Sequence, residues 1–250
     1  MKALLATFLA AAALAAAGCG GDDSPGSNGV ESKAPRDIVA AAAAALRDVK
    51  SYRAVAKQGR DTVVAEVQLP SKLRISVREG NSSAAIIAVS GDVYIRANEA
   101  YWREQGEAGE GASQLAGKWL KSPSSTTDFR DLAKGLDPET GSRCLTRDIG
   151  TLAKGGVENV NGRPAVVVID KGGVAGTAPG RLYVATTGEP LPLKTVVTGN
   201  ERPGGKRDPL CDTDGSRDRK GDNVTLSRFN ESFDISAPSG AVEIGAGTPS

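Results

Sequence analysis

The 250-residue chain contains no histidine, and only 4% of its residues are aromatic. The absence of histidine excludes Ser-His-Asp triads, Cys-His dyads, histidine-ligated zinc and histidine pH switches. The shortage of aromatic rings argues against stacking platforms for nucleic-acid bases. Lys and Arg number 31 and Asp and Glu number 30, so the net charge of +1 gives no bulk attraction for nucleic acid.

Familiar catalytic, cofactor and metal motifs are also missing from the sequence. We find no G-x-S-x-G and no S-x-x-K, and the glycine run at 172–176 lacks the following Gly-Lys-Ser/Thr of a phosphate-binding loop. The acidic stretch from Asp212 resembles a calcium loop, but Arg217 and Asn223 occupy the places of its glycine and glutamate. We therefore expect no catalytic residue, no metal and no cofactor. A hydrolase that uses two carboxylates remains an alternative, because folding can pair acids that are distant in sequence.

The N-terminus has the organisation of an export signal. Lys2 precedes an apolar run from Ala3 to Ala17, which is shorter than the roughly 20 residues that span a bilayer. The following Ala16-Ala17-Gly18-Cys19 resembles a bacterial lipobox. This resemblance implies removal of signal peptide 1–18, acylation of Cys19, for example with palmitate, and anchoring at the extracytoplasmic face of the cell membrane. Residues 19–35 are rich in Gly, Ser, Asp, Asn and Pro, which predicts a flexible tether before a single domain over 36–250.

Two further cysteines remain after Cys19, and they lie 67 positions apart in the exported chain. An even pair of cysteines in an exported protein favours a disulfide, here Cys144–Cys211. Two free thiols are the alternative. Neither cysteine has a partner in a C-x-x-C motif, which argues against redox catalysis.

Hydrophobic periodicity predicts one helix followed by two strand meanders. The helix runs from Arg36 to about Lys50, with Pro35 at its start and an alanine-rich middle. The clearest strand is Lys72–Arg78, where polar and apolar residues alternate without interruption. Similar strands are expected at Tyr52–Lys57, Thr62–Leu69, Ala84–Val89, Asp92–Arg96, Ala100–Arg103, Val157–Val160, Pro164–Asp170, Arg181–Ala185, Leu193–Thr198 and Asn223–Arg228.

Residues 111–152 interrupt the strands with helical spacing, at Asp128–Leu136 and Ser142–Leu152. The fold class is therefore α+β, with a curved antiparallel sheet of about ten or eleven strands. The N-terminal helix and the central helical insert are expected to cover one apolar face of that sheet.

Several short phrases in this order are similar to the LolA/LolB-like half-barrel lipoproteins, especially the LppX/LprG type. They are Ala45-Leu46-Arg47-Asp48-Val49, Gly91-Asp92-Val93-Tyr94-Ile95 before Ala100-Tyr101-Trp102, Gly117-Lys118-Trp119-Leu120, Glu158-Asn159-Val160-Asn161-Gly162 and Leu191-Pro192-Leu193-Lys194. The resemblance covers about Pro35 to Ile244, with Asp212–Asp222 as an unmatched insertion. It implies a half-open barrel, lidded by helices, that binds or carries a lipid or acylated molecule in an apolar cavity.

Inward-facing residues of the strands are the candidates to line such a cavity. These candidates are Leu73, Ile75, Val77, Ile87, Val93, Ile95, Val166, Val168, Leu182 and Val184. Alternation alone does not distinguish a hollow sheet from a filled core, so two functions stay open. One is a lipid carrier, and the other is a structural or partner-binding envelope lipoprotein with a filled core.

Overall fold

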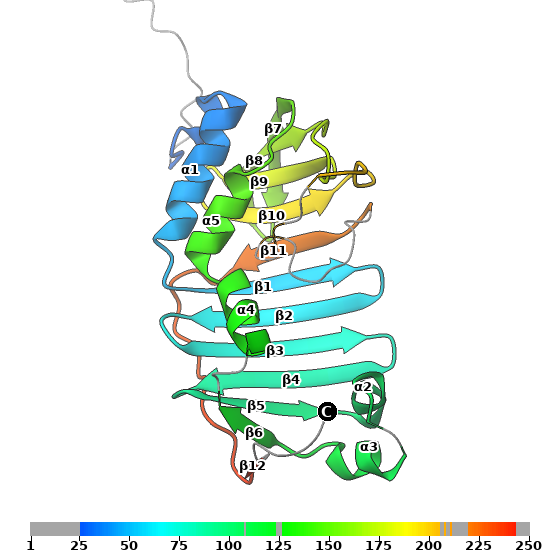
Figure 1. The fold of residues 1–250 in the computed structure, drawn as a ribbon. Coiled ribbons are helices and arrows are strands. Elements are labelled where there is room, and N and C mark those ends of the chain that lie inside the picture. The colour runs from blue at the N-terminus through cyan, green and yellow to red at the C-terminus, as the bar shows by residue number, and fades with distance from the viewer. Residues whose placement is uncertain are drawn as a thin grey trace, which may run out of the picture.

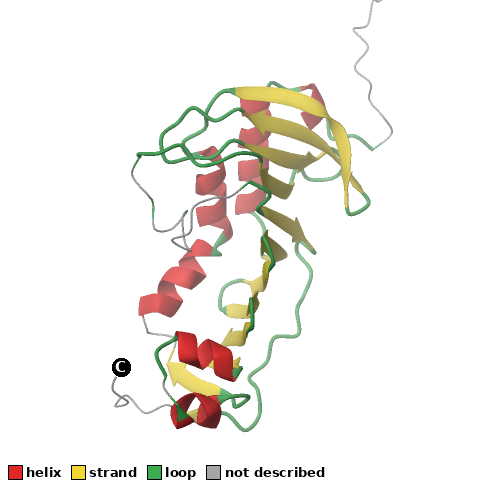
Figure 2. Cartoon of the chain, turned by 90° about the vertical axis from the view of Figure 1, so that its right-hand side faces the viewer, coloured by secondary structure: helices red, strands yellow, loops and turns green. Residues whose placement is uncertain are grey.

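The computed structural model of the chain describes residues 26–107, 109–123, 127–205, 208, 211 and 220–243, without the side chains of 127–129 and 131. Twelve strands in this part of the chain form one curved sheet, with the order β12-β6-β5-β4-β3-β2-β1-β11-β10-β9-β8-β7. Every neighbouring pair is antiparallel except β12 and β6, which are parallel. Helices lie along one side of the sheet (Figures 1 and 2). The predicted α+β half-barrel is thus confirmed.

The strands fall into the two groups that the sequence predicts, except β6 and β12, which were not predicted. The first group comprises β1 Ser51–Gln58, β2 Asp61–Gln68, β3 Lys72–Glu79, β4 Ser82–Val89, β5 Asp92–Ala97 and β6 Leu120–Pro123. The second group comprises β7 Leu152–Val160, β8 Arg163–Asp170, β9 Gly180–Ala185, β10 Pro192–Val197 and β11 Asn223–Ser227, and β12 Val242–Glu243 is the last strand of the described residues. Because β1 pairs with both β2 and β11, the two groups join at the centre of a continuous sheet.

The N-terminal helix covers the second group of strands. Helix α1 Pro35–Arg47 starts with proline, which fits the first turn because its missing N–H has no partner there. Its buried residues Ile38, Val39 and Ala42 pack against Val166 and Val184 of the sheet. The small alanine face lets the helix lie close to the strands, so this part of the core is filled.

Residues 26–34 also belong to the folded domain. A short 3₁₀-helix, η1 Val30–Ser32, buries Val30, and the backbone N–H of Asn28 donates to the carbonyl of Thr186 at 2.7 Å. The tether predicted over residues 19–35 is therefore too long at its C-terminal end. Its earlier part, like the signal peptide, lies outside the described residues. No helix in the described part of the chain is long and apolar enough to cross a membrane.

The central insert forms four short helices: α2 Glu99–Glu104, α3 Glu110–Leu115, α4 Thr127–Gly135 and α5 Pro138–Thr146. The strand predicted at Ala100–Arg103 is wrong, because Asn98 caps α2 by accepting a hydrogen bond from the N–H of Tyr101 at 3.0 Å. The predicted helix Ser142–Leu152 begins instead at Pro138, where Asp137 accepts from the N–H of Glu139 at 2.8 Å. Aspartate before a proline at the first helical position is a helix start.

The two faces of the sheet are covered by different parts of the chain. We call the face toward α1, α4 and α5 the inner face, and the opposite one the outer face. After β11 the chain crosses the outer face toward β12, where it inserts Phe233 and Ile235 against Ile87, Val89 and Tyr94 (Figure 1). Residues 228–243 are called the C-terminal segment below.

A buried carboxylate lies beside the C-terminal segment. The side chain of Glu66 pairs with Arg53 at 3.1 Å and with Arg74 at 3.0 Å, and Arg228 lies 3.8 Å away. The guanidinium of Arg228 also stacks on Phe233, 4.6 Å from the ring centroid. These contacts fix the C-terminal segment to β1, β2 and β3 by charge as well as by apolar packing.

Candidate functional site

Two hollows separate the helices from the inner face of the sheet. The upper hollow, of about 390 Å³, lies between α5 with the loop after it and strands β8 to β11. The lower hollow, of about 460 Å³, lies between α4, the start of α5 and the turns of the β2–β3 and β4–β5 hairpins. Both exceed the roughly 300 Å³ at which pockets begin to hold small molecules.

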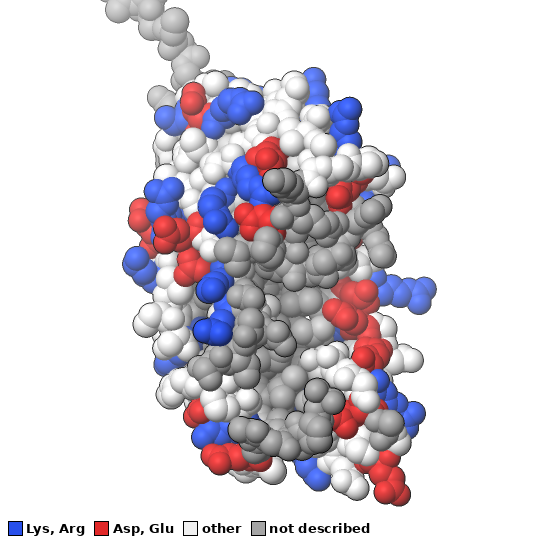
Figure 3. Space-filling model, in the orientation of Figure 1, with Lys and Arg blue, Asp and Glu red and all other residues white. Residues whose placement is uncertain are grey.

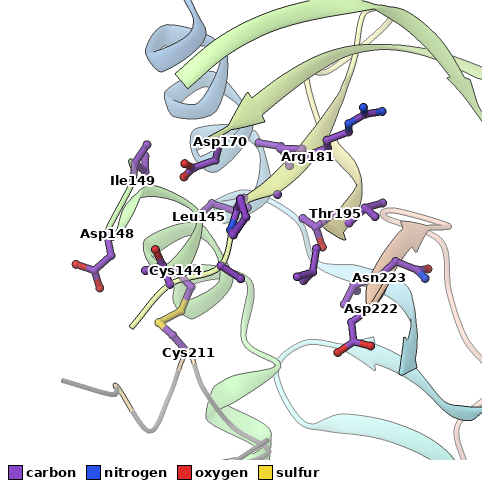
Figure 4. A pocket seen from close by; sticks show the side chains of 18 of the residues that line it. Cys144, Leu145, Asp148, Ile149, Asp170, Arg181, Thr195, Cys211, Asp222 and Asn223 are labelled. Carbon is purple, nitrogen blue, oxygen red and sulfur yellow. A yellow bond between two sulfur atoms is a disulfide. The ribbon is translucent and has the colours of Figure 1, made fainter. Parts of the chain in front are cut away.

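The upper hollow combines an apolar surface with charged side chains. Its apolar lining residues include Val39, Ala56, Leu145, Ile149, Leu152, Val168, Leu182 and Val224. Asp148, Asp170, Arg181 and Asp222 also line this hollow, and their side chains point in different directions around it (Figure 4). A ligand that suits this lining has a hydrocarbon part and a polar end.

Polar contacts fix the loops around the upper hollow. The carboxylate of Asp170 accepts hydrogen bonds from the N–H of Gly150 at 3.1 Å and of Gly172 at 2.7 Å. Arg147 pairs with Asp148 at 2.6 Å and with Asp208 at 2.8 Å. Over α1 and α5, basic and acidic side chains are interspersed on the helix side of the molecule (Figure 3). The local charges are thus largely used within the protein.

A disulfide forms part of the wall of the upper hollow. Cys144 of α5 is bonded to Cys211, with their Cα atoms 5.6 Å apart, and both residues line the hollow (Figure 4). The predicted pairing is confirmed. Because the bond ties α5 to the segment between β10 and β11, it holds two walls of the same hollow together.

The lower hollow is also apolar beneath a charged edge. Its apolar lining residues are Val67, Leu69, Leu73, Ala88, Val89, Ala133 and Leu136. Lys72, Asp92, Arg130, Lys134 and Asp137 supply charges around it. Helix α4 therefore presents cationic side chains beside an apolar space.

One tyrosine fixes the α4–α5 junction to the sheet. The hydroxyl of Tyr52 on β1 donates to the carbonyl of Leu136 at 2.5 Å. Burial, together with the nearby carboxylate of Asp137, raises the pKa of Tyr52 above its ordinary value of 10. The side chain therefore remains a neutral donor at physiological pH. Its hydrogen bond fixes the distance between the α4–α5 junction and β1.

Only some of the predicted cavity residues line these hollows. Val168 and Leu182 line the upper hollow, and Leu73 lines the lower one. Val166 and Val184 are buried beneath α1, and Ile75 is buried in the main core. Val77, Val93 and Ile95 are half-buried on the inner face.

The assignment of Ile87 to the inner face is wrong. Its side chain packs with Phe233 and Ile235 of the C-terminal segment, on the outer face. Sequence reasoning also missed Leu145, Ile149 and Ala133, which line the hollows from the helix side. They belong to the insert that the sequence predicted to be helical, but nothing in the spacing showed which side faced the sheet.

Other predicted features fall outside the described residues. These are the acylation site Cys19 and most of the Asp212–Asp222 loop. Within the described residues, no group of three or more His, Cys, Asp or Glu side chains is placed to hold a metal ion.

Comparisons with known proteins show where this architecture recurs. No family model matches the chain, and no curated protein sequence does. Among solved structures, LprF from Mycobacterium bovis matches with a TM-score of 0.51 and 14% identity, over 82% of this chain and 97% of LprF. The lipoprotein LppX from Mycobacterium tuberculosis matches with a TM-score of 0.48 and 11% identity, over 81% of this chain and 98% of LppX.

The match to LprF extends over 97% of that protein and 82% of this chain. At 14% identity the likeness concerns the fold alone. The chain therefore shares its fold with LprF, in agreement with the half-barrel that the short sequence phrases implied.

Proposed function

We propose that the protein is a membrane-anchored bacterial lipoprotein that binds or carries a lipid or another acylated molecule on the inner face of its half-barrel. The observation that carries the proposal is the pair of hollows, about 390 and 460 Å³, between an apolar sheet face and its covering helices. The shared fold with LprF supports it at the level of architecture.

Transfer of hydrocarbon from water into such a space is favourable by about 0.8 kcal/mol for each methylene group. An acyl chain of about 16 carbons thus gains roughly 10 kcal/mol before the costs of association. The cationic residues around the lower hollow, such as Lys72 and Arg130, suit a polar head rather than a second hydrocarbon end. An amphiphile fits this division better than a fully apolar molecule.

The location at the outer side of the cell membrane rests on the sequence of the N-terminus. The lipobox-like Ala16-Ala17-Gly18-Cys19 supports cleavage before Cys19 and acylation of its thiol. Metabolic labelling with a palmitate analogue should label the wild-type chain and leave Cys19→Ser unlabelled. Equal labelling of the two chains would show that Cys19 is not the acylated residue.

The lipid-binding proposal is tested by filling each hollow. Leu182→Trp places an indole in the upper hollow and Ala133→Trp places one in the lower hollow. Val157→Trp is the matched control, because Val157 is 55% exposed on the edge strand β7. Native mass spectrometry of each purified protein measures the fraction that carries a lipid.

We expect the two hollow-filling variants to lose about tenfold in lipid affinity, equivalent to roughly 1.4 kcal/mol, while the control retains it. Circular dichroism and thermal unfolding confirm that each variant is folded. A wild-type protein that carries no lipid and takes up none from a fluorescent fatty acid would refute the proposal. A single stoichiometric protein partner in its place would favour the envelope scaffold with a filled core.

A further inference from the structure

A third depression lies on the other side of the sheet. It has a volume of about 790 Å³ and runs over strands β2 to β5, next to the residues that flank α2 and α3. Its floor is made of small outer-face side chains in register across the strands, Val64 beside Ser76 and Ser76 beside Ala85. We call this depression the outer groove.

Two arginines line the outer groove from different strands. Arg78 lies on β3 opposite Thr62 and Ser83, and Arg96 lies on β5 opposite Ala85. Both side chains are exposed, and no described carboxylate forms an ion pair with either of them. With strands about 4.8 Å apart, their Cα atoms lie on the order of 12 Å from each other, so the two long side chains can reach one small anion between them.

The position of Arg96 is defined by an aromatic ring. Its guanidinium carbon lies 4.8 Å from the ring centroid of Trp119, just before β6. Stacking on a ring leaves the N–H edge of a guanidinium free to donate hydrogen bonds. Arg96 is therefore oriented by the protein, although none of its donors is used within the described residues.

Hydroxyl groups complete the lining. Thr62, Ser76 and Ser83 line the outer groove, and their side-chain hydroxyls form no hydrogen bond with another described residue. The carboxylate of Glu99, the acid among the lining residues, is paired with Arg103 one turn later in α2. The groove thus offers unpaired cationic donors beside unpaired hydroxyls.

We propose that the outer groove binds a phosphate ester of a polyol, with Arg78 and Arg96 on the phosphate and the hydroxyls on the polyol. The guanidinium fork matches phosphate oxygens in pairs, whereas hydroxyl side chains exchange hydrogen bonds with a polyol in both directions. The same chemistry occurs in the headgroup of phosphatidylglycerol and in soluble glycerol phosphate. The site lies on the face opposite the two hollows, so it is independent of lipid binding on the inner face.

The fluorescence of Trp119 should respond to a ligand in the outer groove, because the guanidinium of Arg96 lies over its ring. The experiment uses the full chain with Cys19→Ser, so that no attached acyl chain contributes. Glycerol 1-phosphate is titrated while tryptophan fluorescence is recorded, with glycerol alone as the uncharged control. In parallel, the protein is sedimented with phosphatidylglycerol vesicles and with phosphatidylcholine vesicles.

We expect a saturable change in fluorescence with glycerol 1-phosphate that glycerol alone does not produce and that Trp119→Phe abolishes. Arg78→Gln and Arg96→Gln should each weaken binding about tenfold, because each removes charge-assisted hydrogen bonds to the phosphate. Arg60→Gln is the matched control, since Arg60 is an exposed arginine in the β1–β2 turn outside the groove. It should bind like the parent chain.

The groove binds a lipid headgroup if the protein sediments with phosphatidylglycerol vesicles and this sedimentation depends on Arg78 and Arg96. It binds a soluble ester if the protein responds to glycerol 1-phosphate but does not bind the vesicles. Absence of both responses would overturn the proposal. So would an equal loss in Arg60→Gln, because that result indicates non-specific charge attraction.

Discussion

The hydrogen bond from Tyr52 to Leu136 joins the α4–α5 junction to β1, and a single substitution can remove it without disturbing the rest of the fold. Tyr52→Phe removes one hydroxyl and leaves the ring in the core, so packing is retained while the carbonyl of Leu136 loses its donor. A hydrogen bond of this kind contributes about 0.5–1.5 kcal/mol, and an acceptor left unsatisfied in a buried place costs about 1–3 kcal/mol. We expect a loss of about 1.5 kcal/mol at neutral pH, equivalent to a fall in Tm of about 3–6 °C for a domain of this size.

Alkaline pH gives the same variant a second signature. Burial raises the pKa of Tyr52 above 10 in the folded state, so the unfolded state releases its proton first as pH rises. The contribution of Tyr52 is therefore complete below pH 10 and is lost above it. Linkage predicts a loss on the order of 1 kcal/mol in wild-type stability by pH 11 from this one group. Tyr101, whose pKa is also raised by burial and by Glu79, contributes in the same direction.

Urea unfolding between pH 8 and pH 11 measures both effects. Tyr52→Phe should start lower at pH 8 and fall less steeply than the wild type, with a residual slope from Tyr101. Hydrogen exchange at pH 7 should show faster opening of α4 and α5 in Tyr52→Phe but not in Tyr94→Phe, whose side chain lies on the outer face. Identical stability and slope in wild type and Tyr52→Phe would refute the assigned role of this hydroxyl.

Three further perturbations test other parts of the structure. Replacing Cys144 and Cys211 by serine opens a 67-residue loop, so thermal unfolding should show a loss of up to about 4 kcal/mol; an unchanged Tm would contradict it. Glu66→Gln leaves three arginines facing one neutral side chain, and urea unfolding should show a loss of about 1–2 kcal/mol, against less than about 0.5 kcal/mol for the exposed control Glu158→Gln. Phe233→Ala should destabilise the domain by about 3 kcal/mol, and a loss below about 1 kcal/mol would show that the C-terminal segment is not held by this ring.

Alternation of polar and apolar residues located most strands, but it failed where both faces of a strand are covered. Strand β3 has one exposed face, so Leu73, Ile75 and Val77 are placed correctly from sequence. Strand β4 contains adjacent Ile86 and Ile87. Ile86 packs against the core on the inner face, whereas Ile87 packs against the C-terminal segment on the outer face. The local sequence of such a strand does not show which alternate residues face inward. That assignment depends on Phe233, which covers Ile87 from 146 positions later in the chain.

The hollows were beyond sequence reasoning for a different reason. Val184 and Leu182 lie two positions apart on the same face of β9, yet Val184 is completely buried beneath α1, whereas Leu182 is half-buried and lines the upper hollow. The difference depends on where α1 and α5 end above the strands, and the spacing predicted the start of α5 at Ser142 instead of Pro138. The positions of the helices determine which apolar residues line a hollow and which pack against another side chain.

The pairing of β1 with β11 has a consequence for biogenesis. Arg53 lies opposite Ser227, so the seam at the middle of the sheet joins residues from the two ends of the chain. Synthesis delivers β11 and the C-terminal segment after β1 and β4, and until then β1 has an open edge and Ile87 has an uncovered face. Pairing between strands that are distant in sequence slows folding and leaves intermediates that are prone to aggregate. We expect the incomplete domain to depend on holding chaperones, and a ribosome-stalled or prematurely terminated product to be a substrate for quality-control proteases.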